Sequence, residues 1–225
     1  MPIIAISRSS YLHGKKIAEG VATKLGYTCI SQEELLDDSQ EFNLPDIKLI
    51  WDLLFILDQA MFWQYRYISY IRALLIRNLQ KDNVVFHGFC GHVFLKELDH
   101  VLNVKITADI EDRAKLIMEH DGITRKETFS FIKTIDSKRK RWCQKLYKVD
   151  IQNISQYDIT INISKFPHDK AVDIICKIVK LNRFQTTPES QKTMNELLIA
   201  AEAGASLNSD YKAERTGFLS CAMEV

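Results

Sequence analysis

Residues 3–18 read IIAISRSSYLHGKKIA, and this stretch decides the fold. The apolar run at residues 3–6 predicts a strand buried on both faces, whereas the spacing of Ile17, Val21 and Leu25 predicts a helix. A polar loop between a strand and a helix is an anion site, because unpaired backbone N–H groups and the positive end of the helix dipole face it. The sequence therefore predicts a phosphate site at this loop.

The loop contains only part of the Walker pattern G-x-x-x-x-G-K-[ST], whose glycines, lysine and hydroxyl bind phosphates and magnesium. Gly14 and Lys15 fit the pattern, but Ser9 stands at the first glycine and Lys16 at the hydroxyl position. The bulky residues 11–13 fill a stretch where side chains would crowd a ligand. A single Gly-Lys pair is a weak signal, and an ordinary surface turn before an amphipathic helix explains it equally well.

A chain of 225 residues that is 46% apolar can bury one sizeable core, so we expect one domain with an appendage. Its 30 basic and 29 acidic residues nearly cancel, so no global field recruits nucleic acid. The five cysteines stand singly without C-x-x-C spacing, which argues against a zinc site or a disulfide framework and favours reduced thiols. Together with the lack of a signal-peptide pattern at the N-terminus, this predicts a cytoplasmic protein.

Strands and helices alternate along the chain, which predicts a parallel sheet with helices on both faces. Thr124 and Glu127 have capping-box spacing at one helix start, and Gly26 is expected to end the first helix. Residues 32–80 carry helical spacing and are interpreted as a helical insertion. The other expected strands are 27–31, 84–86, 101–108 and 157–163, and the other expected helices are 109–120, 124–147 and 169–181.

Residues 183–192 are polar and contain a proline, so we place a domain boundary there, with the main domain ending at residue 181. Residues 182–225 are then a linker and a short segment, with a helix at 194–203 and a strand at 217–225. A segment of this length cannot make its own core. It therefore either docks on the main domain or belongs to a second domain that the chain does not complete.

The insertion is unusually apolar at residues 47–63. Lys48, Asp52 and Asp58 interrupt this run, so it does not predict a transmembrane segment. Its apolar side chains surround the expected helices on every side, which predicts a homodimer or another partner contact through the insertion. In the alternative interpretation, the neighbouring helix at residues 65–79 covers the second face within one chain.

Four segments occur in order along the chain, namely ISRSSYLHGKKIAEGVATKLGY, VVFHGFCG, IEDRAKLIMEHDGIT and YDITINIS. They resemble the cytidylate kinase-like family, a branch of the P-loop nucleoside monophosphate kinases, and the resemblance covers residues 3–181. In the first segment the matching residues are Ile6, Ser7, Arg8, Gly14, Ile17, Ala18, Leu25, Gly26 and Tyr27. Each segment is unspecific alone. Together, at compatible spacing, they imply a P-loop NTPase-like three-layer α/β fold.

The resemblance implies transfer of a phosphoryl group from ATP, with Mg2+, to a monophosphate such as CMP. Guanidinium groups suit this chemistry because they bind phosphate bidentately, although the basic run at residues 138–141 also has the composition of a solvated helix face. The implied cofactor-binding residues are Ser9, Ser10, His13, Gly14, Lys15, Lys16 and Arg113, and the implied substrate-binding residues are Asp136, Lys138, Arg139 and Arg141. Lys15 and Arg139 are the implied catalytic residues, and no residue is assigned to a metal.

Two departures from the family's pattern bear on catalysis. The family's loop typically reads Gly-Ser-Gly-Gly at the place of residues 11–14, and its phosphate-binding arginine after the third strand is replaced by Phe89. His87 and His92 flank that position and could partly substitute for the arginine. Two hypotheses follow. The chain is either a divergent nucleoside monophosphate kinase-like enzyme or a catalytically impaired descendant that acts as a nucleotide-binding or protein-interaction module.

Overall fold

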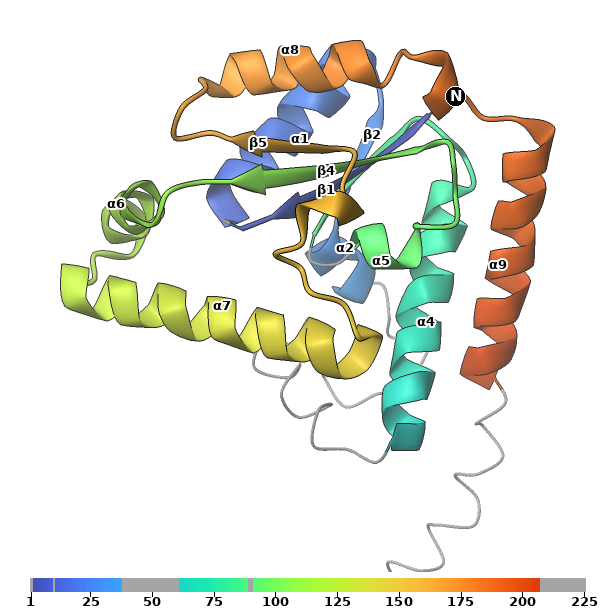
Figure 1. Ribbon diagram of the computed structural model, residues 1–225, viewed down its shortest axis with the longest axis horizontal. Coiled ribbons are helices and arrows are strands. Elements are labelled where there is room, and N and C mark those ends of the chain that lie inside the picture. The colour runs from blue at the N-terminus through green and yellow to red at the C-terminus, as the bar shows by residue number, and fades with distance from the viewer. Residues whose placement is uncertain (1, 10, 38–60, 89–90, 207–225) are drawn as a thin grey trace, which may run out of the picture.

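The computed structural model describes residues 2–9, 11–37, 61–88 and 91–206. They form one five-stranded sheet in the order β2-β3-β1-β4-β5, in which all neighbouring strands are parallel (Figure 1). The strands are β1 (Ile3–Arg8), β2 (Thr28–Ser31), β3 (Val84–Gly88), β4 (Val101–Thr107) and β5 (Ile159–Asn162). The helices are α1 (Tyr11–Leu25), α2 (Gln32–Asp37), α4 (Met61–Leu79), α5 (Gly91–Phe94), α6 (Ile110–Asp121), α7 (Arg125–Tyr147), α8 (His168–Ile178) and α9 (Pro188–Ser206). The predicted parallel sheet is confirmed.

Helices cover both faces of this sheet, so the predicted three-layer arrangement is also confirmed. Side chains alternate along β1, with Ile4 and Ile6 in one core and Ile3 and Ala5 in the other. Helices α1 and α8 close the first core, above the sheet in Figure 1, and α4, α5 and α9 close the second. Burial on both faces is the reason why β1 is a continuous apolar run.

Three helix ends follow the local signals in the sequence. At the start of α7, the Thr124 hydroxyl accepts a hydrogen bond from the backbone N–H of Glu127, and the Glu127 carboxylate accepts one from the backbone N–H of Thr124. Gly122 ends α6 and Gly26 follows α1, with φ angles of 67° and 69° that favour glycine. The predicted capping box and both predicted helix ends are confirmed.

The first helix begins earlier than apolar spacing indicates, because α1 starts at Tyr11 rather than shortly before Ile17. Only residues 9–10 separate β1 from α1. In an α-helix each N–H bonds to the carbonyl four residues earlier, so the N–H of Lys15 falls within the helical ladder. The expectation of a loop that extends to Gly14 is therefore wrong.

Helix α9 begins at Pro188, within the stretch expected to be a linker, so the helix start predicted at residue 194 is wrong. Proline is tolerated in the first turn, and the hydroxyls of Thr187 and Ser190 each accept a hydrogen bond from the other's backbone N–H. The helix lies along α4 (Figure 1), and Met194 and Leu198 are buried in the core beneath the sheet. The division of the chain into a main domain and an appendage stays a prediction.

Part of the predicted insertion and tail lies outside the described residues. This applies to residues 38–60 of the insertion, which include most of its apolar run, and to the predicted strand at 217–225, so the predicted homodimer contact stays a prediction. Among the described helices, none is long and apolar enough to cross a membrane. Cys29 and Cys176 are free thiols, but Cys143 is disulfide-bonded, so the expectation of reduced thiols is wrong for Cys143. Sequence spacing does not reveal this pairing, because it depends on which cysteines the fold brings together.

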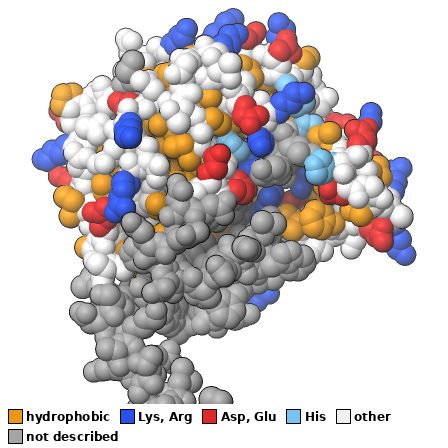
Figure 2. Space-filling model, turned by 180° about the vertical axis from the view of Figure 1, so that it is seen from behind, with side chains coloured by type: hydrophobic (Ala, Val, Ile, Leu, Met, Phe, Trp, Pro, Cys, Tyr) orange, Lys and Arg blue, Asp and Glu red, His pale blue; other side chains and the backbone are white. Residues whose placement is uncertain are grey.

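The surface carries charges of both signs. On the face shown in Figure 2, Lys and Arg side chains are interspersed with Asp and Glu side chains and do not gather in one patch. A local basic site must therefore come from a few side chains that the fold brings together.

Candidate functional site

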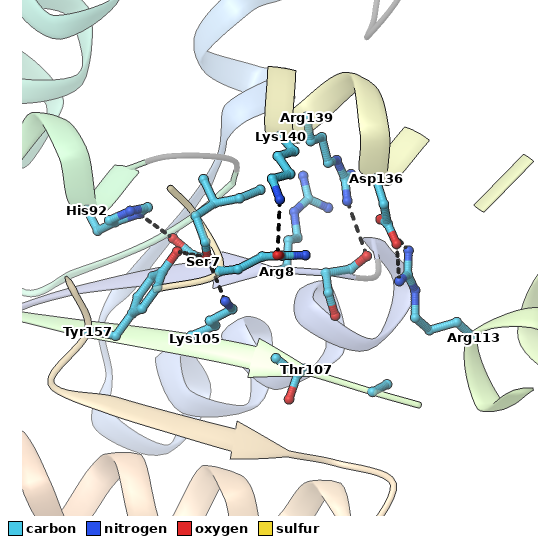
Figure 3. A pocket seen from close by; sticks show the side chains of 14 residues that line it. Ser7, Arg8, His92, Lys105, Thr107, Arg113, Asp136, Arg139, Lys140 and Tyr157 are labelled. Atoms are coloured by element: carbon cyan, nitrogen blue, oxygen red, sulfur yellow. Dashed lines mark hydrogen bonds and ion pairs between the residues drawn. The ribbon is translucent and has the colours of Figure 1, made fainter. Parts of the chain in front are cut away.

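A cavity of about 270 Å3 lies at the carboxyl ends of β1 and β4, beneath α7 (Figure 3). From β1 the chain continues to β2 on one side of the sheet, and from β4 it continues to β5 on the other. Ligands of open parallel sheets bind where the strand order reverses in this way. The lining residues are Ser7, Arg8, Ser9, His92, Lys105, Thr107, Ala108, Arg113, Asp136, Arg139, Lys140, Ile151, Gln152 and Tyr157.

The cavity is strongly basic although the whole chain is nearly neutral. Five lining side chains are basic and one is acidic, namely Arg8, Lys105, Arg113, Arg139 and Lys140 against Asp136. Figure 3 shows that Arg139 and Lys140 descend from α7 while Lys105 and Thr107 come from β4 below. Basic groups that converge from separate elements favour an anionic ligand such as a phosphate group.

Arg113 and Asp136 bind each other across one side of the cavity. The two terminal nitrogens of Arg113 donate to the two carboxylate oxygens of Asp136 at 2.7 and 2.8 Å. This bidentate pair connects α6 to α7. The family resemblance implies that Arg113 binds the cofactor and Asp136 the substrate, and the structure places both at the cavity, where they hold the two helices together.

Arg139 connects α7 to the end of β1. Its Nη1 donates to the carbonyl oxygen of Ser9 at 3.2 Å. Burial lowers the pKa of Arg139 to about 10, with Asp136 acting in the opposite direction, so the guanidinium stays charged at neutral pH. The predicted site residues Ser9 and Arg139 are thus brought together at the cavity.

Lys105 is a cavity residue that the motif analysis does not identify. Its ammonium group donates to the carbonyl oxygen of Ile151 at 2.6 Å and lies 5.0 Å from the centre of the Tyr157 ring. Burial lowers the pKa of Lys105. The signal in the sequence is a lysine inside the otherwise mostly apolar run of β4. Lysine is rarely buried without a partner, so a lysine at such a position indicates a polar site.

The floor of the cavity is an uncharged network. Ser7 Oγ lies 3.0 Å from His92 Nδ1, and the His92 ring lies 4.4 Å from that of Tyr157. Burial lowers the pKa of His92 to about 4, raises that of Tyr157 to about 12, and lowers that of His87 to about 4. Both histidines are therefore neutral at neutral pH. Neither ring therefore supplies the positive charge of an arginine, and the partial substitution of His87 and His92 for the phosphate-binding arginine stays a prediction.

The residues predicted at the start of the first helix do not line this cavity. Gly14 packs against Arg8, since a Cβ atom at position 14 would lie 2.4 Å from Arg8 Cβ. Lys15 pairs with Glu19 at 3.8 Å, and Lys16 is exposed. Ser10 lies outside the described residues.

His13 binds a histidine from another helix. Its Nδ1 lies 2.9 Å from Nε2 of His168, and the two rings stack with centroids 5.1 Å apart. The pair joins the first turns of α1 and α8, and burial is the largest cause that lowers the pKa of each ring. His13 thus has a partner within the chain and is not among the residues that line the basic cavity.

Two further predicted substrate residues, Lys138 and Arg141, also lie outside the cavity lining. Lys138 is half-buried and Arg141 is exposed. They share a helix with Arg139, but their positions direct them to other faces of α7. The dense basic run thus contributes Arg139 and Lys140 to the cavity lining, and of these two only Arg139 is among the substrate-binding residues that the resemblance implies.

The contact between Gly14 and Arg8 leads to a prediction about stability. Replacing a glycine inside a helix by alanine normally stabilises it. We expect Gly14→Ala to lower the free energy of unfolding by about 1–3 kcal/mol instead, because the new methyl group overlaps the Arg8 side chain. Chemical denaturation measures the change. In an Arg8→Gly background the same substitution should not lower the free energy of unfolding. An equal decrease in that background would contradict the explanation.

The buried histidines predict a loss of stability in acid. The pKa values of His87 and His92 lie near 4 in the folded chain, below the unfolded value near 6.5, so their contribution is complete above pH 6.5 and is lost as the pH falls toward 4. We expect the free energy of unfolding, measured by denaturation at pH 7.5 and pH 5, to fall by several kcal/mol. His92→Gln should reduce this difference, because glutamine does not titrate, and an unchanged difference would contradict the explanation.

Phosphate groups fit this site better than Mg2+ does. A cavity of about 270 Å3 with five basic side chains suits the phosphate part of a ligand. Mg2+ needs oxygen ligands, but the one lining carboxylate, Asp136, is held by Arg113, and Lys16 stands where the Walker pattern has a hydroxyl. Within the described ranges, no group of three or more His, Cys, Asp or Glu residues could hold a metal ion.

A comparison with known protein families matches residues 3–165 to the cytidylate kinase-like family, which is more than half of the chain. The chain belongs to the cytidylate kinase-like family. Among curated relatives, the cytidylate kinase of Archaeoglobus fulgidus is 34% identical over 110 residues, which are 47% of this chain and 58% of that protein. The chain thus spans about half the length of the curated relatives it matches.

Solved structures support the same fold. An uncharacterised protein from Eubacterium ventriosum has a TM-score of 0.60 at 22% identity, covering 79% of this chain and 97% of its own. Shikimate kinase from Bacteroides thetaiotaomicron has a TM-score of 0.51 at 14% identity, covering 80% of this chain and 99% of its own. This cytidylate kinase-like chain therefore has the predicted P-loop kinase type of three-layer α/β fold.

Proposed function

We propose that this chain is a divergent nucleoside monophosphate kinase-like protein that transfers the γ-phosphoryl group of ATP to a monophosphate such as CMP. Membership of the cytidylate kinase-like family supports the reaction class. The observation that carries the proposal is the cavity in which five basic side chains converge at the carboxyl ends of β1 and β4. Such an arrangement suits phosphoryl transfer, because charge spreads over the equatorial oxygens of the moving group.

Four of the five basic side chains have the following roles in this proposal. Arg139 and Lys140 approach from α7, and Lys105 approaches from β4, so that an anion between them contacts positive charge from both sides. The Arg113–Asp136 pair holds α7 over the cavity. These groups bind and orient phosphate and stabilise charge that develops during transfer.

A second candidate is a catalytically impaired nucleotide-binding or protein-interaction module. The start of α1 at Tyr11 favours it, since a two-residue connection leaves little backbone to enclose a triphosphate. In this alternative the same basic cavity retains affinity for phosphate without turnover.

A coupled assay for ADP release, run with CMP, UMP, AMP and GMP and with or without Mg2+, tests the proposal. We expect release that depends on ATP and on a pyrimidine monophosphate. Calorimetric titration of ATP and CMP accompanies the assay. Binding without ADP release supports the second candidate, and the absence of both binding and release contradicts both candidates.

The homodimer through residues 32–80 and the cytoplasmic location stay predictions. Light scattering on dilute protein tests the first. A mass near the 26.0 kDa of one chain, unchanged on concentration, would reject the dimer.

A further inference from the structure

We propose that Arg8 is the central phosphate-binding group of the cavity. In this proposal Glu33 pairs with the Arg8 guanidinium in the absence of a ligand, and the phosphate of a bound ligand displaces the Glu33 carboxylate. Arg8 would then supply the charge that the chain lacks at Phe89, after the third strand. This inference rests on the proposed function only in the choice of phosphate as the ligand.

Arg8 stands at the point where the sheet faces the cavity. It is the last residue of β1, between Ser7 and Ser9, and all three line the cavity. Its side chain is only 4% exposed. A guanidinium that is removed from water to this extent requires an anionic partner. At a ligand cavity, the anionic group of a ligand can be that partner.

The start of α1 is shaped around this side chain. A Cβ atom at Gly14 would lie 2.4 Å from Arg8 Cβ and 2.8 Å from Arg8 Cδ. Gly14 therefore provides the space through which the stem of Arg8 passes. The glycine that the Walker-like pattern assigns to a phosphate loop serves here to position a guanidinium.

Arg8 acts electrostatically on residues from both neighbouring elements. Its charge is among the causes that lower the pKa of Arg139 on α7 and of His87 at the end of β3. Arg8 and Arg139 thus place two guanidinium groups at one cavity, where their positive charges repel each other. An anion bound between them relieves this repulsion.

The present partner of Arg8 is suited to exchange. Nη2 of Arg8 donates to both carboxylate oxygens of Glu33, at 2.5 and 2.7 Å. The Glu33 side chain is 43% exposed, so water stabilises its carboxylate when the pair separates. A phosphate dianion carries more charge than the carboxylate and also binds a guanidinium bidentately. Because Glu33 belongs to α2, at the start of the insertion, the exchange would release α2 from β1 when phosphate binds.

Calorimetric titration of pyrophosphate into the full chain tests this exchange. We expect Arg8→Gln to weaken binding at least about tenfold and Arg8→Lys to weaken it less, because lysine keeps the charge but not the planar fork. We expect Glu33→Gln to tighten binding at least about threefold, because it removes the competing carboxylate. Glu111→Gln, which breaks an exposed ion pair with Arg125, is the matched control and should leave affinity unchanged.

The direction of the Glu33→Gln effect separates a ligand contact from a structural ion pair. A structural pair predicts equal or weaker binding in Glu33→Gln, and that result overturns the inference, as does unchanged affinity in Arg8→Gln. If Arg8→Gln does not fold, the affinities of Arg8→Lys and Glu33→Gln for pyrophosphate test the inference instead. Failure of wild type and Glu33→Gln to bind pyrophosphate at millimolar concentration also overturns it.

Titration of CMP in place of pyrophosphate distinguishes a nucleotide phosphate from an inorganic one. An Arg8 effect on both ligands assigns the residue to the shared phosphate group, and an effect on pyrophosphate alone assigns it to inorganic phosphate chemistry. The ADP-release assay is independent of these outcomes. If no ADP is released but the affinities change as expected, the proposed function is contradicted and the Arg8 site is supported. If ADP is released but binding does not depend on Arg8, the proposed function is supported and the Arg8 site is contradicted.

Discussion

Arg139→Ala is expected to lower the turnover of phosphoryl transfer at least about a hundredfold, because removing a positive group that stabilises developing charge costs several kcal/mol of transition-state binding. Arg139 lies at the cavity and donates to the carbonyl of Ser9, and its guanidinium is largely desolvated, which strengthens its interaction with an anion. Arg139→Lys should restore only part of the rate, since an ammonium group lacks the planar fork.

Steady-state kinetics in the ADP-release assay measures this effect, with Arg141→Ala as the matched control. Arg141 lies on the same helix but is exposed and does not line the cavity, so its removal should change turnover little. Normal turnover in Arg139→Ala would exclude Arg139 from catalysis. An equal loss in Arg141→Ala would support the assignment of Arg141 to the substrate that sequence resemblance implies.

Met194→Ala is expected to lower the free energy of unfolding by about 2–5 kcal/mol, the usual cost of emptying a large buried side chain. Met194 is fully buried in the core that α9 shares with α4, α5 and β1. Chemical denaturation measures the loss. Ile199→Ala removes an apolar side chain of similar size from the same helix, but this residue is 67% exposed, so its effect should stay within about 0.5 kcal/mol. Equal effects would contradict the packing of α9 in this core.

The sheet and its covering helices were predictable from sequence because their signals are local. A continuous apolar run such as β1 indicates burial on both faces, and a Thr124–Glu127 pair indicates a helix start, without knowledge of distant residues. The starts of α1 and α9 were not predicted. The first turn of α1, YLHG, lies outside the apolar spacing of Ile17, Val21 and Leu25, and the first turn of α9 is polar, so apolar spacing marks neither start. In α9 the start also depends on the reciprocal hydrogen bonds of Thr187 and Ser190.

The site was predictable only in part. Ser9, Arg113, Asp136 and Arg139 do line the cavity, and the family resemblance implied all four. The contribution of Lys105 depends on the pairing of β4 beside β1, which brings together residues about a hundred positions apart along the chain, and no motif encodes that distance. Gly14 illustrates the converse, since its place in a motif suggested a phosphate contact while its neighbour in space is Arg8.

The sheet order also affects how this chain can fold. Ile4 in the central strand pairs with Val85 on one side and with Leu102 on the other. Both partner strands are therefore synthesised roughly 80 residues or more after β1. During synthesis at about 5–20 residues per second, the apolar β1 waits for several seconds with both edges open. Helix α1 follows directly and packs on the same core, so it is the first cover that this strand can obtain. We therefore expect slow refolding and a tendency of nascent chains to associate through β1, because the first strand lies in the middle of the sheet.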